Sequence, residues 1–139
     1  MPNYHPLFVH FPLAILTLSA IFDFGGILFK RDELNRVGWW CLLAGVTSLF
    51  VTLTTGLHAE GTVKISEAAQ NTFEIHEGLA FVVTAVFCGL LLWRVAGKTN
   101  LPVRLRIGYF ALIAIGLTLM WVVAWFGGEL VYKYGIGVT

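Results

Sequence analysis

Residues 7–29 read LFVHFPLAILTLSAIFDFGGILF, an almost wholly apolar run whose one acidic residue is Asp23. Three more apolar runs follow at residues 38–57, 75–96 and 107–127. Each run holds about 20 residues, enough for a helix that rises about 1.5 Å per residue to cross a hydrocarbon layer about 30 Å thick. Because the runs are continuous and do not alternate with polar residues, they predict membrane helices and argue against a strand-built barrel.

The composition agrees with a chain that lies in lipid. Of its 139 residues, 58% are hydrophobic and only 12% are charged, whereas a soluble domain carries about 25% charged residues. The gaps between the apolar runs are too short for a separate soluble module. The sequence therefore predicts an all-α fold, a single integral membrane four-helix bundle that takes up residues 1–139. Its helices are expected at about residues 7–29, 38–60, 72–96 and 106–127.

The basic residues gather on one side of the predicted bundle. Most lie in or beside the connections that join the first helix to the second and the third to the fourth: Lys30, Arg31, Arg36, Arg94, Lys98, Arg104 and Arg106. The other side has only Lys64 and Lys133, among several glutamates. Because cytoplasmic loops are rich in Lys and Arg, both termini are expected on the outer side. The formal net charge of +1 gives no reason to expect a nucleic-acid partner.

The histidines all fall near the outer ends of the predicted helices: His5, His10, His58 and His76. Pro6 suits the first turn of helix one, so His10 lies about 6 Å inside that helix. Gly61 is a natural helix stop, which leaves His58 about one turn before the end of helix two. Asn71 and Glu74 resemble a capping pair, so His76 lies just inside helix three. Three helices thus present an imidazole at a similar height, with His5 just above.

The neighbours of these histidines indicate that the imidazoles point into the bundle. Ala14 shares a helix face with His10, and Ala80 shares one with His76. A polar stripe on helix two leads to His58 and consists of Thr47, Ser48, Thr54 and Thr55. Small and weakly polar residues mark helix–helix interfaces in membranes. Any one histidine could simply bond a backbone carbonyl, but three at one depth suggest a functional site.

Three chemistries suit four imidazoles. Two axial histidines from different helices can hold haem b, and Gly56 near His58 and Gly78 near His76 would let a flat macrocycle approach the backbone. Copper or zinc would instead need ligands drawn together within a few ångströms, and would recruit carboxylates. The carboxylates near the outer ends are Glu60, Glu74 and Glu77. A proton relay of histidine and glutamate needs no cofactor.

The acidic residue of the first helix calls for a partner. Asp23 lies inside an apolar span near its inner end, so an ion pair with Arg36, Arg94 or Arg106 is expected, with a role in a proton path as the alternative.

The tail GGELVYKYGIGVT (residues 127–139) contains glycines with apolar residues between them. Glycine permits sharp turns, and a disordered tail would be less apolar. We therefore expect residues 127–139 to fold back as a lid over the outer end of the bundle.

Three stretches carry a resemblance to a known family. The opening HPLFVHFPLAILTLSAIFDFGG, the isolated His58 and His76, and the closing GGELVYKYGIGV resemble the bacterial membrane family called domain of unknown function 2231. The resemblance runs from His5 to Val138 and implies a four-helix, multi-pass protein of the bacterial inner membrane, with its outer side periplasmic. Some members of the family are joined to c-type cytochrome or iron–sulfur redox proteins, or are encoded beside them. For this chain, the resemblance therefore implies a role in electron transfer. Relatives often have histidine where this chain has Tyr134, so that position is either a lost ligand or never was one.

The hypothesis that follows is a b-type cytochrome-like protein with one or two haem b groups near the outer face. His10, His58 and His76 would hold the irons, with His5 as the fourth ligand if two haems are present. Trp121 and Trp125 would pack on the macrocycle, or else anchor the helix at the interface. Bis-histidine ligation leaves no open coordination position, which favours electron transfer over an enzymatic reaction.

Two alternatives from other classes stay open. One is a membrane protein that binds copper or zinc at the outer mouth of the bundle. The other is a cofactor-free structural or assembly subunit whose histidines only cap helices. The lipid bilayer is the first expected partner of the chain. The haem hypothesis predicts a redox partner as well: a periplasmic c-type cytochrome, an iron–sulfur protein or a membrane quinol. A homo-oligomer is also compatible with the sequence.

Overall fold

The computed structural model describes residues 4–97 and 106–137. Every regular element in this part of the chain is helical, which confirms the all-α fold. The long helices are α2 (His10–Leu28), α3 (Asp32–Glu60), α4 (Gln70–Ala96) and α5 (Arg106–Tyr132). Two short ones, α1 (His5–Phe8) and the 3-10 helix η1 (Glu67–Ala69), lead into α2 and α4. The segments long and apolar enough to cross a membrane are His5–Leu28, Asp32–Glu60, Glu67–Ala96 and Arg106–Tyr132.

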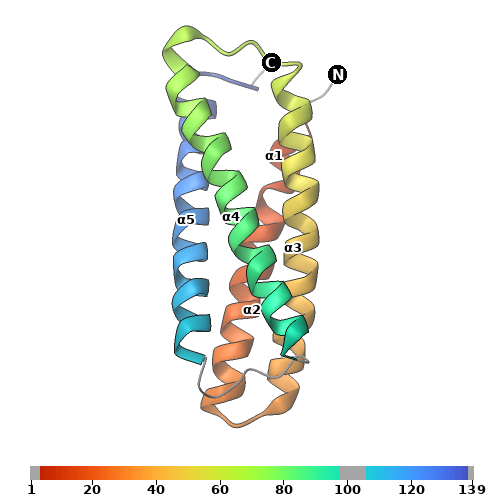
Figure 1. Ribbon diagram of the computed structural model, residues 1–139. Coiled ribbons are helices and arrows are strands. Elements are labelled where there is room, and N and C mark those ends of the chain that lie inside the picture. Colours follow the sequence, from red (N-terminus) through yellow and green to blue (C-terminus); the bar gives the residue numbers. More distant parts are fainter. Residues whose placement is uncertain (1–3, 98–105, 138–139) are drawn as a thin grey trace.

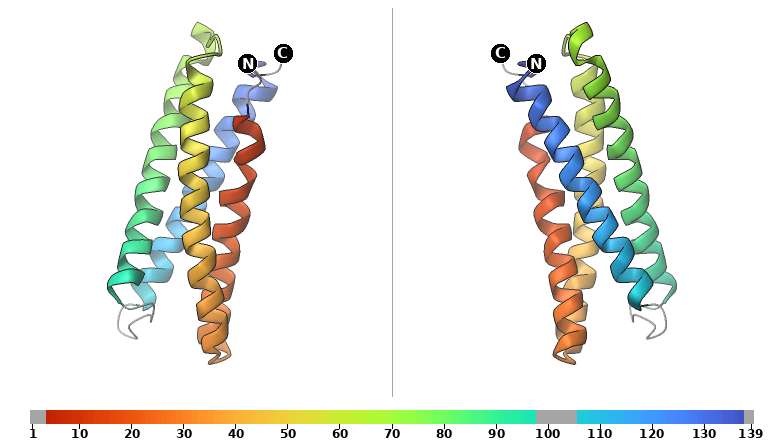
Figure 2. Two further views of the ribbon diagram at one scale, coloured as in Figure 1. Left: turned by 90° about the vertical axis from the view of Figure 1, so that its right-hand side faces the viewer. Right: turned by 90° about the vertical axis from the view of Figure 1, so that its left-hand side faces the viewer.

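The long helices stand side by side and alternate in direction (Figures 1 and 2). α2 runs away from the end that holds both termini, α3 returns to it, and α4 and α5 repeat this path (Figure 1). We call α1 to α3 the first hairpin and α4 to α5 the second hairpin. The end of the bundle with both termini is the histidine end, and the opposite end, where Asp23 and Arg94 meet, is the ion-pair end.

The break between α1 and α2 follows from Pro12. Proline has no backbone N–H, so it cannot donate to the carbonyl of Phe8, four residues earlier. α1 ends at Phe8 and α2 begins at His10. The hydroxyl of Thr52, on α3, donates to the carbonyl of Phe8 instead, at 3.1 Å. The hydrogen bond that proline removes is thus replaced from the neighbouring helix.

Two helices are longer than the sequence predicts. α3 begins at Asp32 rather than near residue 38, because Asp32 and Glu33 occupy its first turn, where negative charge favours a helix N-terminus. α5 continues through Gly127 and Gly128 to Tyr132; glycine is common in membrane helices. The expected lid therefore starts after Tyr132, not at residue 127.

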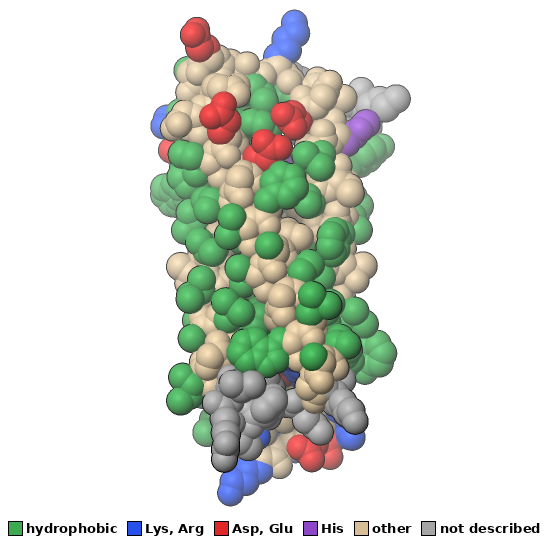
Figure 3. Space-filling model, viewed as in Figure 1, with side chains coloured by type: hydrophobic (Ala, Val, Ile, Leu, Met, Phe, Trp, Pro, Cys, Tyr) green, Lys and Arg blue, Asp and Glu red, His purple; other side chains and the backbone are tan. Residues whose placement is uncertain are grey.

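The interior is packed around small residues that let helices approach. Leu16 of α2 sits against Gly45 of α3, and Phe87 of α4 sits against Gly116 of α5. Leu16 and Phe87 are both buried. Large apolar side chains such as Trp40 and Ile107 instead remain exposed. On the face shown in Figure 3, apolar side chains are spread over the middle of the bundle, and most of the acidic side chains lie at the histidine end. Such a surface suits a chain surrounded by lipid.

Candidate functional site

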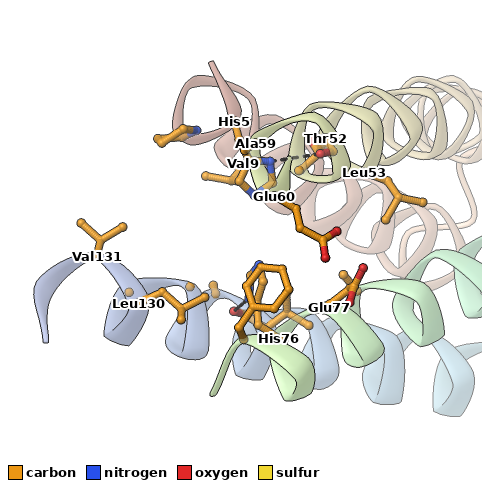
Figure 4. A pocket seen from close by; sticks show the side chains of 18 of the residues that line it. His5, Val9, Thr52, Leu53, Ala59, Glu60, His76, Glu77, Leu130 and Val131 are labelled. Atoms are coloured by element: carbon orange, nitrogen blue, oxygen red, sulfur yellow. Dashed lines mark hydrogen bonds between the residues drawn. The ribbon is translucent and has the colours of Figure 1, made fainter. Parts of the chain in front are cut away.

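A cavity of about 460 Å³ opens between the two hairpins at the histidine end. Its walls are mostly apolar, with Leu49 on the first hairpin and Met120 on the second. His5 and His76 face each other from opposite walls (Figure 4). We call this space the histidine cavity. Its size lies in the range of about 300–1,000 Å³ that holds small-molecule ligands and cofactors.

α1 and α3 fix the ring of His5. Its Nδ1 lies 3.1 Å from the carbonyl oxygen of Thr52 and 3.3 Å from the hydroxyl of Thr55. A Cβ at Gly56 would lie 3.1 Å from Cε1 of His5, so glycine leaves the ring its place. Because Pro12 ends α1 early, the short helix is positioned by α3, and His5 is positioned with it.

α4 and α5 hold His76 in the same way. Its Nδ1 lies 3.0 Å from the carbonyl oxygen of Val123. A Cβ at Gly127 would lie 3.1 Å from Cε1 of the ring. Gly127 therefore leaves room for the ring of His76, as Gly56 leaves room for the ring of His5.

These hydrogen bonds select the tautomer of both rings. A carbonyl oxygen can only accept, so Nδ1 of each neutral imidazole carries the proton and the lone pair lies on Nε2. A histidine that ligates a metal usually donates its other ring N–H to a carbonyl or carboxylate. The two ring centroids are 6.4 Å apart, with their planes at 83°. Hydrogen bonds through Nδ1 are therefore compatible with metal ligation by His5 and His76 through Nε2.

The structure separates the other two histidines from this pair. His10 is exposed, although it is one of the residues that line the cavity. His58 is exposed and is not part of that lining. The expectation that all the histidines point into the bundle is therefore wrong for His58, and only His5 and His76 face each other.

The residues expected beside a macrocycle also lie elsewhere than the sequence pattern predicts. Trp121 and Trp125 are 62% and 71% exposed, so they face away from the bundle, as interface anchors would. Gly56 lies against His5 rather than serving His58, and the space beside Gly78 is open. Gly127, which the sequence pattern assigns to the tail, lines the cavity and lies against His76.

Two carboxylates lie at the mouth of the cavity. Glu60 of α3 and Glu77 of α4 extend toward each other beside the histidine pair (Figure 4). Among the described residues, however, no three His, Cys, Asp or Glu side chains come close enough together to hold a metal ion. The arrangement offers two imidazoles and a gap rather than a complete cage of protein ligands.

The tail closes part of the histidine end. After α5, Gly135 adopts a φ of +67°, which only glycine takes without strain. The N–H of Ile136 donates to the carbonyl of Leu130 at 2.9 Å, and both side chains line the cavity. Hydrogen bonds with Thr72 and Lys133 hold the pKa of Tyr134 below its ordinary value, so Tyr134 contacts α4 rather than the cavity.

A buried polar cluster lies at the ion-pair end. Arg94 donates to Asp23, and the hydroxyl of Tyr109 donates to the same carboxylate at 2.7 Å. Arg94 also donates to the carbonyl of Asn35 at 3.1 Å. A Cβ at residue 38 would collide with the Asp23 carboxylate, so Gly38 is required there. Of the three arginines expected as partners of Asp23, the structure selects Arg94.

Comparison with known proteins agrees with this membrane fold. No curated protein and no solved structure matches the chain. A family model described as "Predicted membrane protein (DUF2231)" matches residues 2–139. That span includes both histidines of the cavity and the tail that covers it. The chain therefore belongs to the DUF2231 family of predicted membrane proteins.

Proposed function

We propose that this protein is a b-type cytochrome-like electron carrier of the bacterial inner membrane, with one haem b in the histidine cavity. His5 and His76 would be its two axial ligands. The observation that carries the proposal is the pair of facing imidazoles, one from each hairpin, with both Nδ1 atoms bonded to backbone carbonyls.

The distance between the rings supports this assignment. Two collinear metal–imidazole bonds of about 2 Å put the two ring centroids about 6 Å apart. The centroids of His5 and His76 are 6.4 Å apart. An ordinary edge-to-face contact between rings also falls in this range, so the tautomers and the surrounding space must add the rest of the support.

The donor set and the walls of the cavity add that support. Haem brings four equatorial nitrogens of its own and needs only two axial ligands, which matches a site with two histidines and no third protein ligand among the described residues. The mostly apolar lining suits a macrocycle. Gly56 and Gly127 leave room for the two imidazoles beside α3 and α5.

Haem in such a site would supply one-electron chemistry, and the protein would set its access to water and partners. With both axial positions taken by histidine, the site favours electron transfer over binding of a substrate. The cavity opens at the histidine end, and the positive-inside rule favours a periplasmic location for this end. A periplasmic c-type cytochrome, an iron–sulfur protein or a membrane quinol is the partner we propose.

Four single variants test the proposal. His5→Ala and His76→Ala should each abolish the low-spin haem spectrum of the detergent-purified protein. His58→Ala is the matched control, because its side chain is exposed and outside the cavity lining. His10→Ala tests the exposed histidine of the lining, and both variants should retain full haem content by pyridine hemochrome assay. Haem that is lost equally in all four variants, or in none, would refute the assignment of these two ligands.

Copper or zinc at the mouth of the cavity is the second candidate. The observation in its favour is that Glu60 and Glu77 extend toward each other beside the histidines (Figure 4). The carboxylates and imidazoles would have to move closer together to bind the metal, since no three such side chains of the described residues are close enough now. If this candidate is correct, Glu60→Gln with Glu77→Gln should lower bound copper or zinc in elemental analysis. Under the haem proposal the same double variant keeps its haem, because neither carboxylate is an axial ligand.

A further inference from the structure

The two histidines belong to a pattern that spans the whole chain. The hydrogen bonds His5–Thr52 and His76–Val123 each join residues 47 positions apart. Each residue of the second bond lies 71 positions after its counterpart in the first, and the same separation joins Asp23 to Arg94. The histidine and its acceptor carbonyl therefore occur twice, at one constant shift.

The contacts of the glycines repeat at the same shift. His5 rests against Gly56, and His76 rests against Gly127. Deeper in the bundle, Leu16 rests against Gly45 and Phe87 against Gly116. Both residues of each contact in the second hairpin are displaced by the same 71 positions from those in the first.

The buried core repeats as well. All but two of the buried residues of α2 and α3 have a buried counterpart 71 positions later. The corresponding pairs are Pro12 with Val83, Leu16 with Phe87, Ser19 with Leu90, Asp23 with Arg94, Gly38 with Tyr109, Leu42 with Ile113, Gly45 with Gly116, Leu49 with Met120 and Ala59 with Leu130. No insertion or deletion interrupts the correspondence.

The arrangement in space defines an axis. α2 and α4 run in one direction and α3 and α5 in the other (Figures 1 and 2), so the two hairpins are related by a pseudo-twofold axis along the bundle, as in parallel repeats of transporters. Equivalent residues meet at both ends: His5 faces His76, and Asp23 pairs with Arg94. The axis passes between the members of each pair.

We infer that the chain is a duplicated helical hairpin, and that the histidine cavity binds one ligand on the pseudo-twofold axis, with an equivalent histidine from each hairpin on either side. The ligand class is a metal centre with two opposite, equivalent coordination positions. This identification of the ligand rests on the proposed function; the duplication does not.

The same symmetry sets the number of ligands at one. The position equivalent to His10 is Phe81, and the position equivalent to His58 is Glu129. Neither exposed histidine therefore has a symmetric partner with which to build a second site. The count of one haem per chain follows from the fold rather than from the number of histidines.

The two hairpins carry different residues at those equivalent positions where identical residues would destabilise the bundle. Two equal charges at positions 23 and 94 would repel each other across the axis in a buried site. The chain has Asp in one copy and Arg in the other, and Gly38 and Tyr109 differ correspondingly: glycine makes space for the carboxylate, and the phenol donates to it. This difference makes the pairing of unlike hairpins favourable.

Imidazole rescue tests the symmetric ligand. His5→Gly and His76→Gly, produced with haem supplied, should each lose the low-spin spectrum and regain it when free imidazole is added, with half-saturation at similar concentrations. The inference is wrong if only one of the two variants loses the low-spin spectrum, or if only one regains it with imidazole. In that case one histidine alone holds the haem, although the protein still binds it. If the unaltered protein binds no haem, the proposed function and the identified ligand are both refuted.

Exchange of the residues that differ tests the duplication without any ligand. Asp23→Arg alone and Arg94→Asp alone should each lower the thermal midpoint of the protein in detergent, because each puts like charges together. The fourfold variant with Asp23→Arg, Arg94→Asp, Gly38→Tyr and Tyr109→Gly should recover most of that loss, since equivalent positions can exchange their residues. A fourfold variant no more stable than the single variants would overturn the equivalence of the hairpins.

Discussion

At the residue scale, the decisive feature is which ring nitrogen each histidine uses. His5 and His76 both bond a backbone carbonyl through Nδ1. Backbone acceptors cannot be removed by changing a side chain, so the tautomer is fixed by the path of α3 and α5. This leaves Nε2 as the unprotonated nitrogen of each neutral ring.

Asp23 provides a prediction at the same scale. Its carboxylate and the guanidinium of Arg94 are both buried, and removing one partner of a buried ion pair costs about 3–5 kcal/mol. Asp23→Asn should therefore destabilise the protein by roughly this amount, measured by unfolding in mixed micelles. Asp32→Asn at the exposed start of α3 is the control and should cost less than about 1 kcal/mol.

A double variant separates charge from packing at this pair. Asp23→Leu with Arg94→Met removes both charges together, and such apolar replacements of buried pairs are often neutral or stabilising. The double variant should thus be more stable than Asp23→Asn. Equal destabilisation by both would mean that the cluster acts through its shape rather than through its charges.

At the scale of the helices, Gly56 and Gly127 keep α3 and α5 clear of the two imidazoles. A side chain at either position would displace the ring that lies 3.1 Å from the added Cβ. Gly56→Val and Gly127→Val should each weaken haem retention and shift the absorption bands. Gly78→Val is the matched control, because a Cβ there meets nothing within 4 Å; it carries the same β-branched penalty in a helix. Equal haem loss in all three variants would assign the effect to helix stability alone.

The helices are predictable from the sequence, but their orientation about their own axes is not. Hydropathy predicts four spans, and the depth of Asp23 limits its partners to three arginines. Because every face of these helices is largely apolar, periodicity cannot tell a lipid-facing residue from a core residue. The inward placement expected for His58 is wrong for this reason, and Trp121 and Trp125 have the exposed placement that interface anchors would have.

One signal for the site lies in the sequence itself and was missed. At a shift of 71 positions, His5 coincides with His76, Gly45 with Gly116, and Gly56 with Gly127. Six other positions are identical at this shift, and most of the remaining pairs differ, since apolar residues replace one another freely in a membrane core. Aligned with itself at this shift, the amino-acid sequence pairs His5 with His76 and Gly56 with Gly127.

At the scale of the whole molecule, the bundle has two chemically different ends. The histidine end has a cavity and both termini, and the other end has a closed ion pair. Lys30 and Arg31 lie in the connection at the ion-pair end. The positive-inside rule therefore predicts a cytoplasmic ion-pair end and a periplasmic cavity.

Single cysteines can test this orientation. In a background with Cys41 and Cys88 replaced by Ala, Lys133→Cys should react with a membrane-impermeant maleimide in intact spheroplasts. Arg31→Cys should react only after the membrane is permeabilised. The reverse labelling pattern would place the cavity on the cytoplasmic side and remove the periplasmic redox partner from the proposal.

The most direct test of haem in the histidine cavity is a visible absorption spectrum of the detergent-purified protein, as isolated and after dithionite. One haem held by His5 and His76 should give a Soret band that sharpens on reduction, split α and β bands, and one haem per chain by pyridine hemochrome assay. A featureless spectrum from cells that supply haem would contradict it.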